Sequence, residues 1–216
     1  MNTRQYVNKE KALIFRITHL ENIPWILNNG LRCQNSDNLD PKYIRIGSPD
    51  LIKKRASRSV PIPPGGCLND YISFYFTPLS IMLYNITTGH GDIRQWDRRG
   101  IVIFVSSLSR QNNLNIPFVF TDGHAYRRTT QFFNELSNVD TIDWEILQNR
   151  DFKNDPDRDP DKKRRYQAEA LAWKSLPIKA LLGIICFDQM TTEQIQQKAL
   201  TRHPTLKTIC NPTWYF

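Results

Sequence analysis

The chain has 216 residues, of which 40% are hydrophobic and 23% are charged, and this composition is typical of one globular domain with a well-formed core. Lysine and arginine outnumber aspartate and glutamate by 29 to 21, so the formal net charge of +8 favours an anionic partner. The spacing of the four cysteines and four histidines argues against a zinc site or a disulfide framework, and no apolar run approaches the ~20 residues that span a bilayer. Residues 1–11 are polar and lack the apolar segment of a signal peptide, so the sequence predicts a cytoplasmic protein without metal or membrane contact.

The first predicted strand, residues 13–17, is apolar and rich in β-branched side chains. It leads into a short helix that Asn22 is expected to cap, with Pro24 in the first turn and Gly30 just past the end. Residues 34–49 are polar and contain two prolines and a glycine, which predicts a loop.

A basic segment and an aromatic strand come next, separated by a Pro-Pro-Gly-Gly turn at 63–66. Residues 51–58 are predicted to form a short basic helix and residues 71–76 an aromatic strand. Positive charge beside a glycine turn suits phosphate groups, and aromatic rings with polar tips suit flat rings that stack. The segment therefore indicates a nucleotide or a nucleic acid strand as ligand, although a solvated basic loop before a core strand has the same pattern.

The rest of the chain continues to mix strands and short helices. Apolar runs of strand length predict buried strands, and amphipathic spacing predicts helices. The expected strands are 101–105, 118–120, 182–187 and 205–210, with a further strand beginning near Glu169, and the expected helices are 80–87, 130–136, 144–147 and 191–200. The charged run 150–165 contains two prolines and predicts a solvated, mobile basic loop.

The predicted fold class is α+β, because strands outnumber helices and do not alternate with them regularly. The sequence contains no Walker A loop and no GxGxxG motif, which argues against P-loop and Rossmann nucleotide sites.

Short motifs follow one another in order from residue 13 to the C-terminus and together resemble one family, the DarT-type DNA ADP-ribosyltransferase toxins. These toxins are partners of DarG antitoxins in bacterial toxin–antitoxin modules. The motifs are Arg16-Ile17-Thr18-His19, Lys54-Arg55, Pro64-Gly65-Gly66, Asp70-Tyr71, Phe74-Tyr75-Phe76-Thr77-Pro78 with Ser80 and Met82-Leu83, Pro117-Phe118-Val119-Phe120-Thr121-Asp122 with His124, Tyr166-Gln167-Ala168-Glu169 and Trp214-Tyr215-Phe216.

The resemblance implies an ADP-ribosyltransferase fold, with a split, mostly antiparallel sheet, short flanking helices and NAD⁺ in the cleft. It implies a toxin that transfers ADP-ribose from NAD⁺ to N3 of thymine in single-stranded DNA and releases nicotinamide. NAD⁺ is then a co-substrate, no metal is needed, and the expected partner besides DNA is a DarG-type macrodomain antitoxin that binds a monomer.

Two catalytic residues follow from the resemblance. Glu169 matches the essential glutamate, whose carboxylate stabilises the oxocarbenium-like transition state as nicotinamide leaves. By its sequence context alone it resembles a surface glutamate at the start of a strand. Arg55 matches a residue described as a proton acceptor, but its guanidinium stays protonated, with a pKa above ~12. We therefore expect an electrostatic role, either on the thymine anion or on the NAD⁺ pyrophosphate.

The resemblance also implies two sets of binding residues. The NAD⁺ set, together with the loop 34–55, comprises Arg16, Ile17, Thr18, Trp25, Arg55 and Tyr75. The DNA set, mostly within the acceptor-presenting region 123–169, comprises Met82, His124, Tyr126, Arg127, Arg128, Trp144, Arg164 and Arg165.

Both sets suit their ligands chemically. Tyr75 is expected to stack on nicotinamide, although a core aromatic residue is an equal alternative. Arginines that neutralise phosphates and aromatic rings that stack on bases are the combination that binds single strands. His124, with an unperturbed pKa of ~6.5, is also a candidate to move the thymine proton. A single strand is expected because a duplex pairs thymine N3 unless the base is flipped out.

Two other readings stay open at this point. One is a nucleic-acid-binding module without catalysis, and the other is an ADP-ribosyltransferase that acts on RNA or protein.

Overall fold

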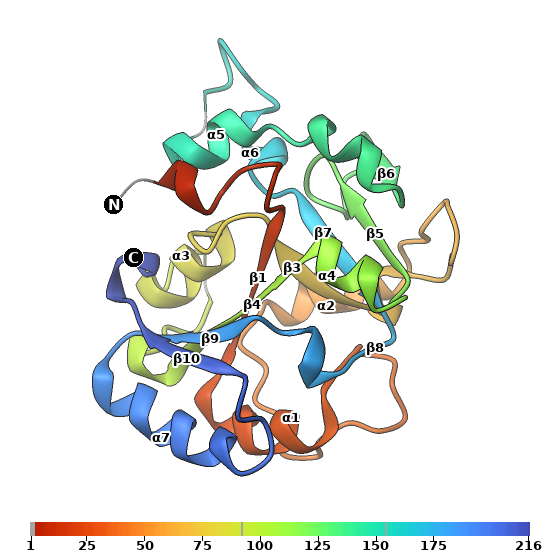
Figure 1. The fold of residues 1–216 in the computed structure, drawn as a ribbon. Coiled ribbons are helices and arrows are strands. Elements are labelled where there is room, and N and C mark those ends of the chain that lie inside the picture. The colour runs from red at the N-terminus through yellow and green to blue at the C-terminus, as the bar shows by residue number, and fades with distance from the viewer. Residues whose placement is uncertain (1–2, 92, 154) are drawn as a thin grey trace.

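The computed structural model describes residues 3–91, 93–153 and 155–216. One position between the predicted helix 80–87 and the predicted strand 101–105 therefore lies outside the described residues, as do one position within the charged run 150–165 and the first two residues of the polar segment 1–11. Eight strands form one sheet in the order β10-β9-β4-β1-β3-β7-β5-β6, and β2 pairs with β8 separately (Figure 1). The strands are β1 Leu13–His19, β2 Leu31–Arg32, β3 Tyr71–Tyr75, β4 Ile101–Ser107, β5 Phe118–Thr121, β6 Phe132–Phe133, β7 Glu169–Trp173, β8 Ser175–Leu176, β9 Gly183–Cys186 and β10 Lys207–Cys210.

The large sheet consists of two halves, β10-β9-β4-β1 and β3-β7-β5-β6, which pair with each other at one position. Strand β1 runs along β4 over its whole length, from Leu13 to His19. On its other side it pairs with β3 at one position, Phe15 opposite Tyr75. All neighbouring strands are antiparallel except β9 and β10, which are parallel. The predicted α+β class is confirmed, and the weak junction of β1 and β3 is the split from which the site opens.

The helices cover the two ends of the sheet. Helices α1 and α7 lie at one end, whereas α5 and α6 lie at the other (Figure 1). Five of the described helices begin at a side chain that accepts a backbone N–H, namely Ser48 before α2, Ser80 before α3, Ser107 before α4, Asp143 before α5 and Asp188 before α7. The helices are α1 Ile23–Asn29, α2 Pro49–Ala56, α3 Ile81–Thr88, α4 Leu108–Asn113, α5 Trp144–Asn149, α6 Lys162–Arg165 and α7 Gln189–Leu200. Within the described part of the chain, no helix is long and apolar enough to cross a membrane.

The main core surrounds β4, whose residues are all buried because β1 and β9 flank it and other elements cover its faces. A second, smaller cluster lies under the loop 57–67 and the hairpin between β5 and β6. It contains Val60, Leu68, Tyr71, Val119, Ala125 and Leu171. This cluster supports the strands that carry the site.

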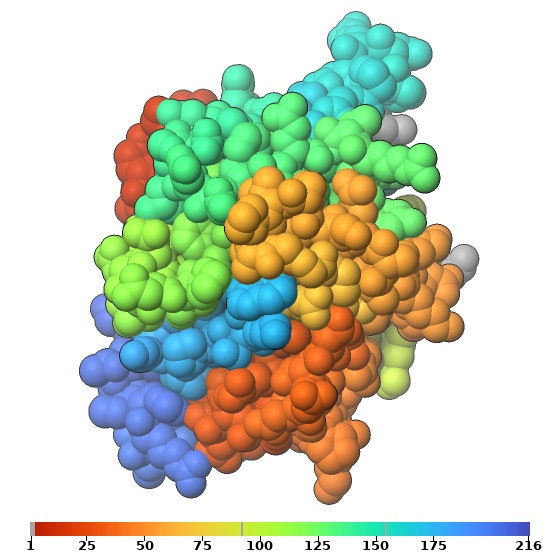
Figure 2. Space-filling model, turned by 90° about the vertical axis from the view of Figure 1, so that its right-hand side faces the viewer, coloured from red at the N-terminus to blue at the C-terminus, as the bar shows by residue number. Residues whose placement is uncertain are grey.

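Several predicted elements are wrong in detail. Residues 130–136 do not form a helix: Phe132 and Phe133 form β6 and pair with Thr121 and Phe120. Asn22 precedes α1, but its side chain makes no capping hydrogen bond because it contacts other partners. The run 150–165 ends in helix α6 rather than continuing as a loop. Residues 156–158 in this run are exposed, and the segment between α5 and α6 protrudes from the molecule in Figures 1 and 2.

Candidate active site

A cavity of about 240 Å³ opens where β1 and β3 diverge. Its wall comes from β1, α1, the loop 34–48, α2, β3, α3 and the start of β7. All six residues of the predicted NAD⁺ set line it, namely Arg16, Ile17, Thr18, Trp25, Arg55 and Tyr75. Sequence segments that are far apart therefore converge on one space that can hold a ligand.

Glu169, the first residue of β7, points its carboxylate into this cavity although its side chain is only 1% exposed. Its Oε1 accepts a hydrogen bond from the backbone N–H of Ala125 at 2.9 Å. Nη1 of Arg55 donates to both carboxylate oxygens, at 3.2 Å to Oε1 and 2.9 Å to Oε2. A buried carboxylate is costly unless it is paired and hydrogen-bonded, and these contacts meet that need. The geometry leaves a negative charge at the cavity wall.

Arg55 approaches Glu169 from the last turn of α2, and its side chain is 11% exposed. Its Nη2 donates to Oγ of Ser73 on β3 at 2.7 Å, so the guanidinium spans β3 and β7. Arg16 approaches the same serine from β1 and donates from Nη1 to the Ser73 carbonyl at 2.9 Å. Ser73 thus fixes two arginines at the cleft, while Nε of Arg16 is buried without a hydrogen-bond partner among the described residues.

Asn22 joins the loop 34–48 to the cavity. Its side chain donates to Oγ1 of Thr18 and to the carbonyl of Ile44, and its carbonyl oxygen accepts the Ile44 N–H. The hydroxyls of Thr18 and Tyr43 lie 3.2 Å apart and share a hydrogen bond. The loop is thereby tied to β1 beside the predicted NAD⁺ residues.

Tyr75 and Met82 form another part of the wall. The Tyr75 hydroxyl donates to Sδ of Met82 at 3.8 Å. Burial, and secondly the charge of Glu169, raise the pKa of Tyr75 well above its usual value, so its hydroxyl stays protonated and remains a donor. Tyr75 lies opposite Glu169 in the sheet, which places an aromatic ring beside the carboxylate.

His124 lies on the hairpin loop 122–131, with Nδ1 4.0 Å from Oε1 of Glu169. The backbone N–H of Tyr126 donates to the same Nδ1 at 3.2 Å. Burial lowers the pKa of His124, and Glu169 opposes this change only in part. The lowered pKa favours the neutral ring at pH 7, and the Tyr126 N–H on Nδ1 leaves the ring hydrogen on Nε2, so His124 is a donor there, while the predicted proton shuttle stays a prediction.

The predicted DNA set is divided by the structure. Met82 and His124 line the cavity. Tyr126 packs at the edge of the second cluster, while Arg127 and Arg128 are exposed on the hairpin loop. Four of these five residues follow one another on the hairpin loop, Met82 lies on α3, and their contacts with DNA stay predictions.

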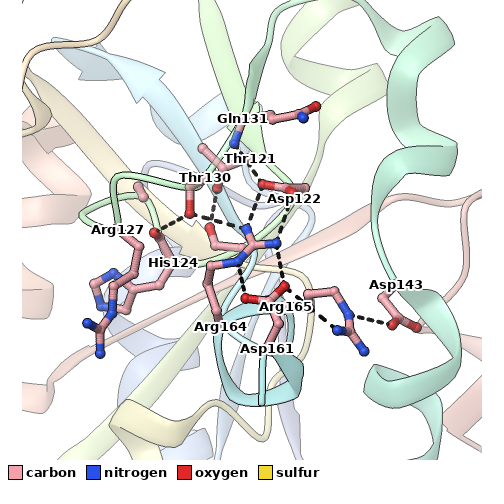
Figure 3. A network of polar contacts seen from close by, with 12 residues as sticks. Thr121, Asp122, His124, Arg127, Thr130, Gln131, Asp143, Asp161, Arg164 and Arg165 are labelled. Atoms are coloured by element: carbon pink, nitrogen blue, oxygen red, sulfur yellow. Dashed lines mark hydrogen bonds and ion pairs between the residues drawn. The ribbon is translucent and has the colours of Figure 1, made fainter. Parts of the chain in front are cut away.

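The other three residues of the set are engaged elsewhere. Trp144 packs edge-on against Phe76 and donates from Nε1 to a backbone carbonyl, which is the environment of a core residue. Arg164 is held by two carboxylates, as Figure 3 shows, and Arg165 lies within salt-bridge distance of three, those of Asp143, Asp159 and Asp161. Guanidinium groups that are already paired with carboxylates are poorly placed to neutralise phosphates, which argues against the predicted contacts.

Comparison with known proteins identifies the family. The profile described as "ssDNA thymidine ADP-ribosyltransferase, DarT" matches residues 15–216. The chain is also 50% identical over 210 residues to a "DNA ADP-ribosyl transferase" of Escherichia coli O127:H6 (strain E2348/69 / EPEC), covering 97% of this chain and 96% of that protein. The chain belongs to the DarT family. The predicted family and enzyme class, a DNA ADP-ribosyltransferase, are therefore confirmed.

Solved DarT structures have the same fold. The DarT of Thermus sp. 2.9 in complex with ADP-ribosylated ssDNA has a TM-score of 0.84 and 30% identity, covering 96% of this chain and 97% of that one. The same Thermus protein in complex with NAD⁺ has a TM-score of 0.81. The Thermosipho africanus DarTG in complex with ADP-ribose has a TM-score of 0.73 at 20% identity, and this likeness concerns the fold alone.

The DarT motifs do not reveal every residue that builds this site. Ser73 interrupts an aromatic strand and carries no signal of its own, yet it contacts both arginines. Asn22 has the pattern of a helix cap, and Tyr43 lies in a loop without any motif. Among the described residues, no group of histidine, cysteine and carboxylate side chains is arranged to hold a metal ion.

The buried histidine of this DarT chain predicts a measurable dependence of stability on pH. Since the pKa of His124 is lowered on folding, the unfolded chain binds the proton more tightly than the folded chain. The free energy of unfolding should fall as the pH drops below about 6.5, by at most about 1.4 kcal/mol per unit from this group. Urea unfolding of the wild type and of His124→Gln between pH 5 and pH 8 (roughly the titration range of histidine) measures the difference. The exposed His90→Gln is the control, and identical pH profiles for the wild type and His124→Gln would contradict the assignment.

Proposed function

We propose that this protein transfers ADP-ribose from NAD⁺ to N3 of thymine in single-stranded DNA and releases nicotinamide. The observation that carries the proposal is the pairing of Glu169 with Arg55 at one wall of a cavity, beside His124. A negative charge and a positive charge then face the reacting atoms from the same side of the cleft.

In this proposal, the predicted NAD⁺-binding residues and the segment 34–55 hold NAD⁺ in the cavity. Arg16 is the candidate for the pyrophosphate, because its buried Nε has no hydrogen-bond partner among the described residues and guanidinium groups bind phosphate well. The ring of Tyr75 is the candidate surface for nicotinamide. The loop 34–48, tied to β1 through Asn22, covers the dinucleotide.

Glu169 acts on the donor. As the bond between C1′ and nicotinamide breaks, positive charge develops on the ribose, and a carboxylate fixed nearby stabilises it. The Glu169 carboxylate accepts hydrogen bonds from Ala125 and Arg55, and its two oxygens retain capacity for a ribose hydroxyl. It does not need to move in order to act, because these partners already fix its position.

Arg55 and His124 act on the acceptor. The new bond joins C1′ to N3 as the bond from C1′ to nicotinamide breaks. N3 loses its proton to solvent water, so negative charge develops on the base. The Arg55 guanidinium stabilises that charge while it stays protonated. The Nε2–H of neutral His124 is a donor for a carbonyl oxygen of the base. Thymine has such carbonyls on both sides of N3, whereas the N3 of cytosine carries no hydrogen.

The strand that contains the base is proposed to pass over the hairpin loop 122–131. Arg127 and Arg128 are exposed there, and Tyr126 offers an aromatic edge. Such a surface combines charge with stacking, as single-strand binding requires. Residues 123–169 then present the acceptor, within one ADP-ribosyltransferase domain.

We further propose that the protein is a cytoplasmic toxin that acts as a monomer and is controlled by a DarG-type macrodomain antitoxin. The proposal rests on the resemblance to the DarT–DarG modules and on the family assignment.

Mass spectrometry of oligonucleotides incubated with NAD⁺ tests the acceptor. We expect one ADP-ribose per modified thymine in a single strand and much less in the matching duplex, because pairing hides N3. Two matched controls are a strand with cytosine in place of thymine and a strand with N3-methylthymine, and neither should react. Modification of either control would contradict the N3 assignment, and labelling of RNA or protein alone would favour the alternative acceptors.

A further inference from the structure

Arg164 lies outside the cavity wall, yet it occupies the inside of the hairpin loop 122–131 that carries His124 (Figure 3). Its side chain is 12% exposed. Nη1 and Nη2 donate to the two oxygens of Asp122, at 2.9 and 3.1 Å, at the start of the loop. Nη1 also donates to Oγ1 of Thr130, at 3.2 Å, near its end. One guanidinium therefore joins the two ends of the loop.

The middle of the loop is fixed by the same residue. The backbone N–H of His124 donates to the carbonyl of Arg164 at 3.0 Å. The Thr130 hydroxyl, which contacts the Arg164 guanidinium, donates to the His124 carbonyl at 2.8 Å. The His124 N–H thus depends directly on Arg164, whereas the His124 carbonyl is shared between Thr130, which contacts Arg164, and the N–H of Arg127 at 2.9 Å.

The position of Arg164 is itself fixed from the other side. Asp161, the residue just before α6, accepts hydrogen bonds from Nε of Arg164 at 2.7 Å and from Nη2 at 2.8 Å. The hydrogen bonds that Arg164 donates to Asp161, and secondly those to Asp122, raise the pKa of Arg164 above its usual range, so its charge is permanent. The guanidinium of Arg164 and the two carboxylates around it together carry a net negative charge. This cluster repels a phosphate rather than attracting one.

The loop delivers two groups to the reacting atoms. Ala125 donates its N–H to Oε1 of Glu169, and His124 lies 4.0 Å from the same oxygen. A displacement of the loop moves both groups relative to the carboxylate. In a reaction that depends on alignment, a shift of ~1 Å reduces the rate by roughly 100-fold.

We propose that Arg164 is a positioning residue: it holds the hairpin loop 122–131 so that His124 and the Ala125 N–H meet Glu169 correctly, and it does not contact DNA phosphates. The inference rests on the proposed function only for the role of the loop in presenting the acceptor. Absence of DNA transfer by the wild type would defeat the proposed function, whereas the variants below test Arg164 alone.

The two roles give opposite kinetic signatures. If Arg164 positions the loop, Arg164→Gln should lower kcat for DNA transfer by roughly 100-fold and change NAD⁺ affinity little. The slope of log Kd for a thymine oligonucleotide against log salt should then stay at the wild-type value. If Arg164 contacts a phosphate, the slope should fall by about 0.7 and the loss should appear in Kd. The exposed Arg128→Gln is the matched comparison, for which we expect the second signature.

Asp122→Asn provides an independent test of the role of Arg164. It removes the carboxylate at the loop and leaves Arg164 with more positive charge to offer, so a phosphate contact would be strengthened. Positioning instead predicts a fall in kcat like that of Arg164→Gln, and a double variant with no further fall, because the two residues act on the loop together. Additive losses, or tighter DNA binding with the wild-type kcat, would overturn the proposal.

Gly123→Ala decides the question if Arg164→Gln does not fold. A Cβ at this position would meet the Arg164 side chain and, at 2.9 Å, its carbonyl oxygen, so it displaces Arg164 without removing a charge. We expect a lower kcat with an unchanged salt slope, while the exposed Lys198→Gln on α7 serves as a remote control. A wild-type kcat in Gly123→Ala would refute the proposal, as would a kcat loss that is matched by an equal loss of NAD⁺ affinity.

Discussion

Replacing Glu169 with glutamine should reduce ADP-ribose transfer to DNA by roughly 10³-fold, the scale expected when a preorganised electrostatic group at a reacting centre is lost. Glutamine keeps the size of the side chain and an oxygen that can accept the Ala125 N–H, but it removes the negative charge that faces the ribose. The effect should therefore appear in kcat, with a smaller change in the affinity for NAD⁺.

The measurement is a single-turnover rate with a thymine oligonucleotide and labelled NAD⁺. Glu145→Gln, at an exposed glutamate on α5, is the control for the substitution itself. DNA binding by Glu169→Gln should persist, because the residue is buried at the base of the cavity rather than on the hairpin loop. A variant that transfers ADP-ribose at the wild-type rate would remove Glu169 from the mechanism and favour a binding module.

Sequence motifs single out Glu169 and Arg55 as candidates because both match positions of the family's motifs, in an order along the chain that can be recognised. They do not show that the two side chains touch. That contact joins residues 114 positions apart and depends on the fold bringing the last turn of α2 to the first residue of β7. Ser73, which completes the arrangement, is invisible in the sequence because its role comes only from its neighbours in the fold.

Apolar runs predict β4, β5 and β9 well, since buried strands are continuous hydrophobic segments. Short or charged segments are predicted poorly. The pattern of residues 130–136 suits a helix, but pairing with β5 makes Phe132 and Phe133 a strand. The charged run 150–165 suggests a solvated loop, whereas Asp122, 42 positions from Arg164, draws that arginine into a buried network. Such partners are set by tertiary structure and cannot be read from local composition.

Replacing Arg55 with methionine should damage both stability and activity, and the two effects can be separated. Glu169 is 1% exposed, and Arg55 is its only partner of fixed positive charge within salt-bridge distance among the described residues. Removal of one member of a buried pair leaves an uncompensated charge and costs about 3 kcal/mol or more. Urea unfolding of Arg55→Met at neutral pH should show a loss of this size.

The double variant Arg55→Met/Glu169→Gln should recover most of that stability, because a neutral amide no longer needs a counter-charge and can still accept the Ala125 N–H. Its activity should stay as low as that of the weaker single variant, since neither charge is present at the reacting centre. A double variant that is as unstable as Arg55→Met would show that Arg55 stabilises the fold through Ser73 and packing rather than through Glu169. Recovery of stability without recovery of transfer would show that Arg55 is needed to neutralise the charge of Glu169 in the fold. It would also show that both charges are needed for catalysis, which explains why the fold keeps a buried ion pair.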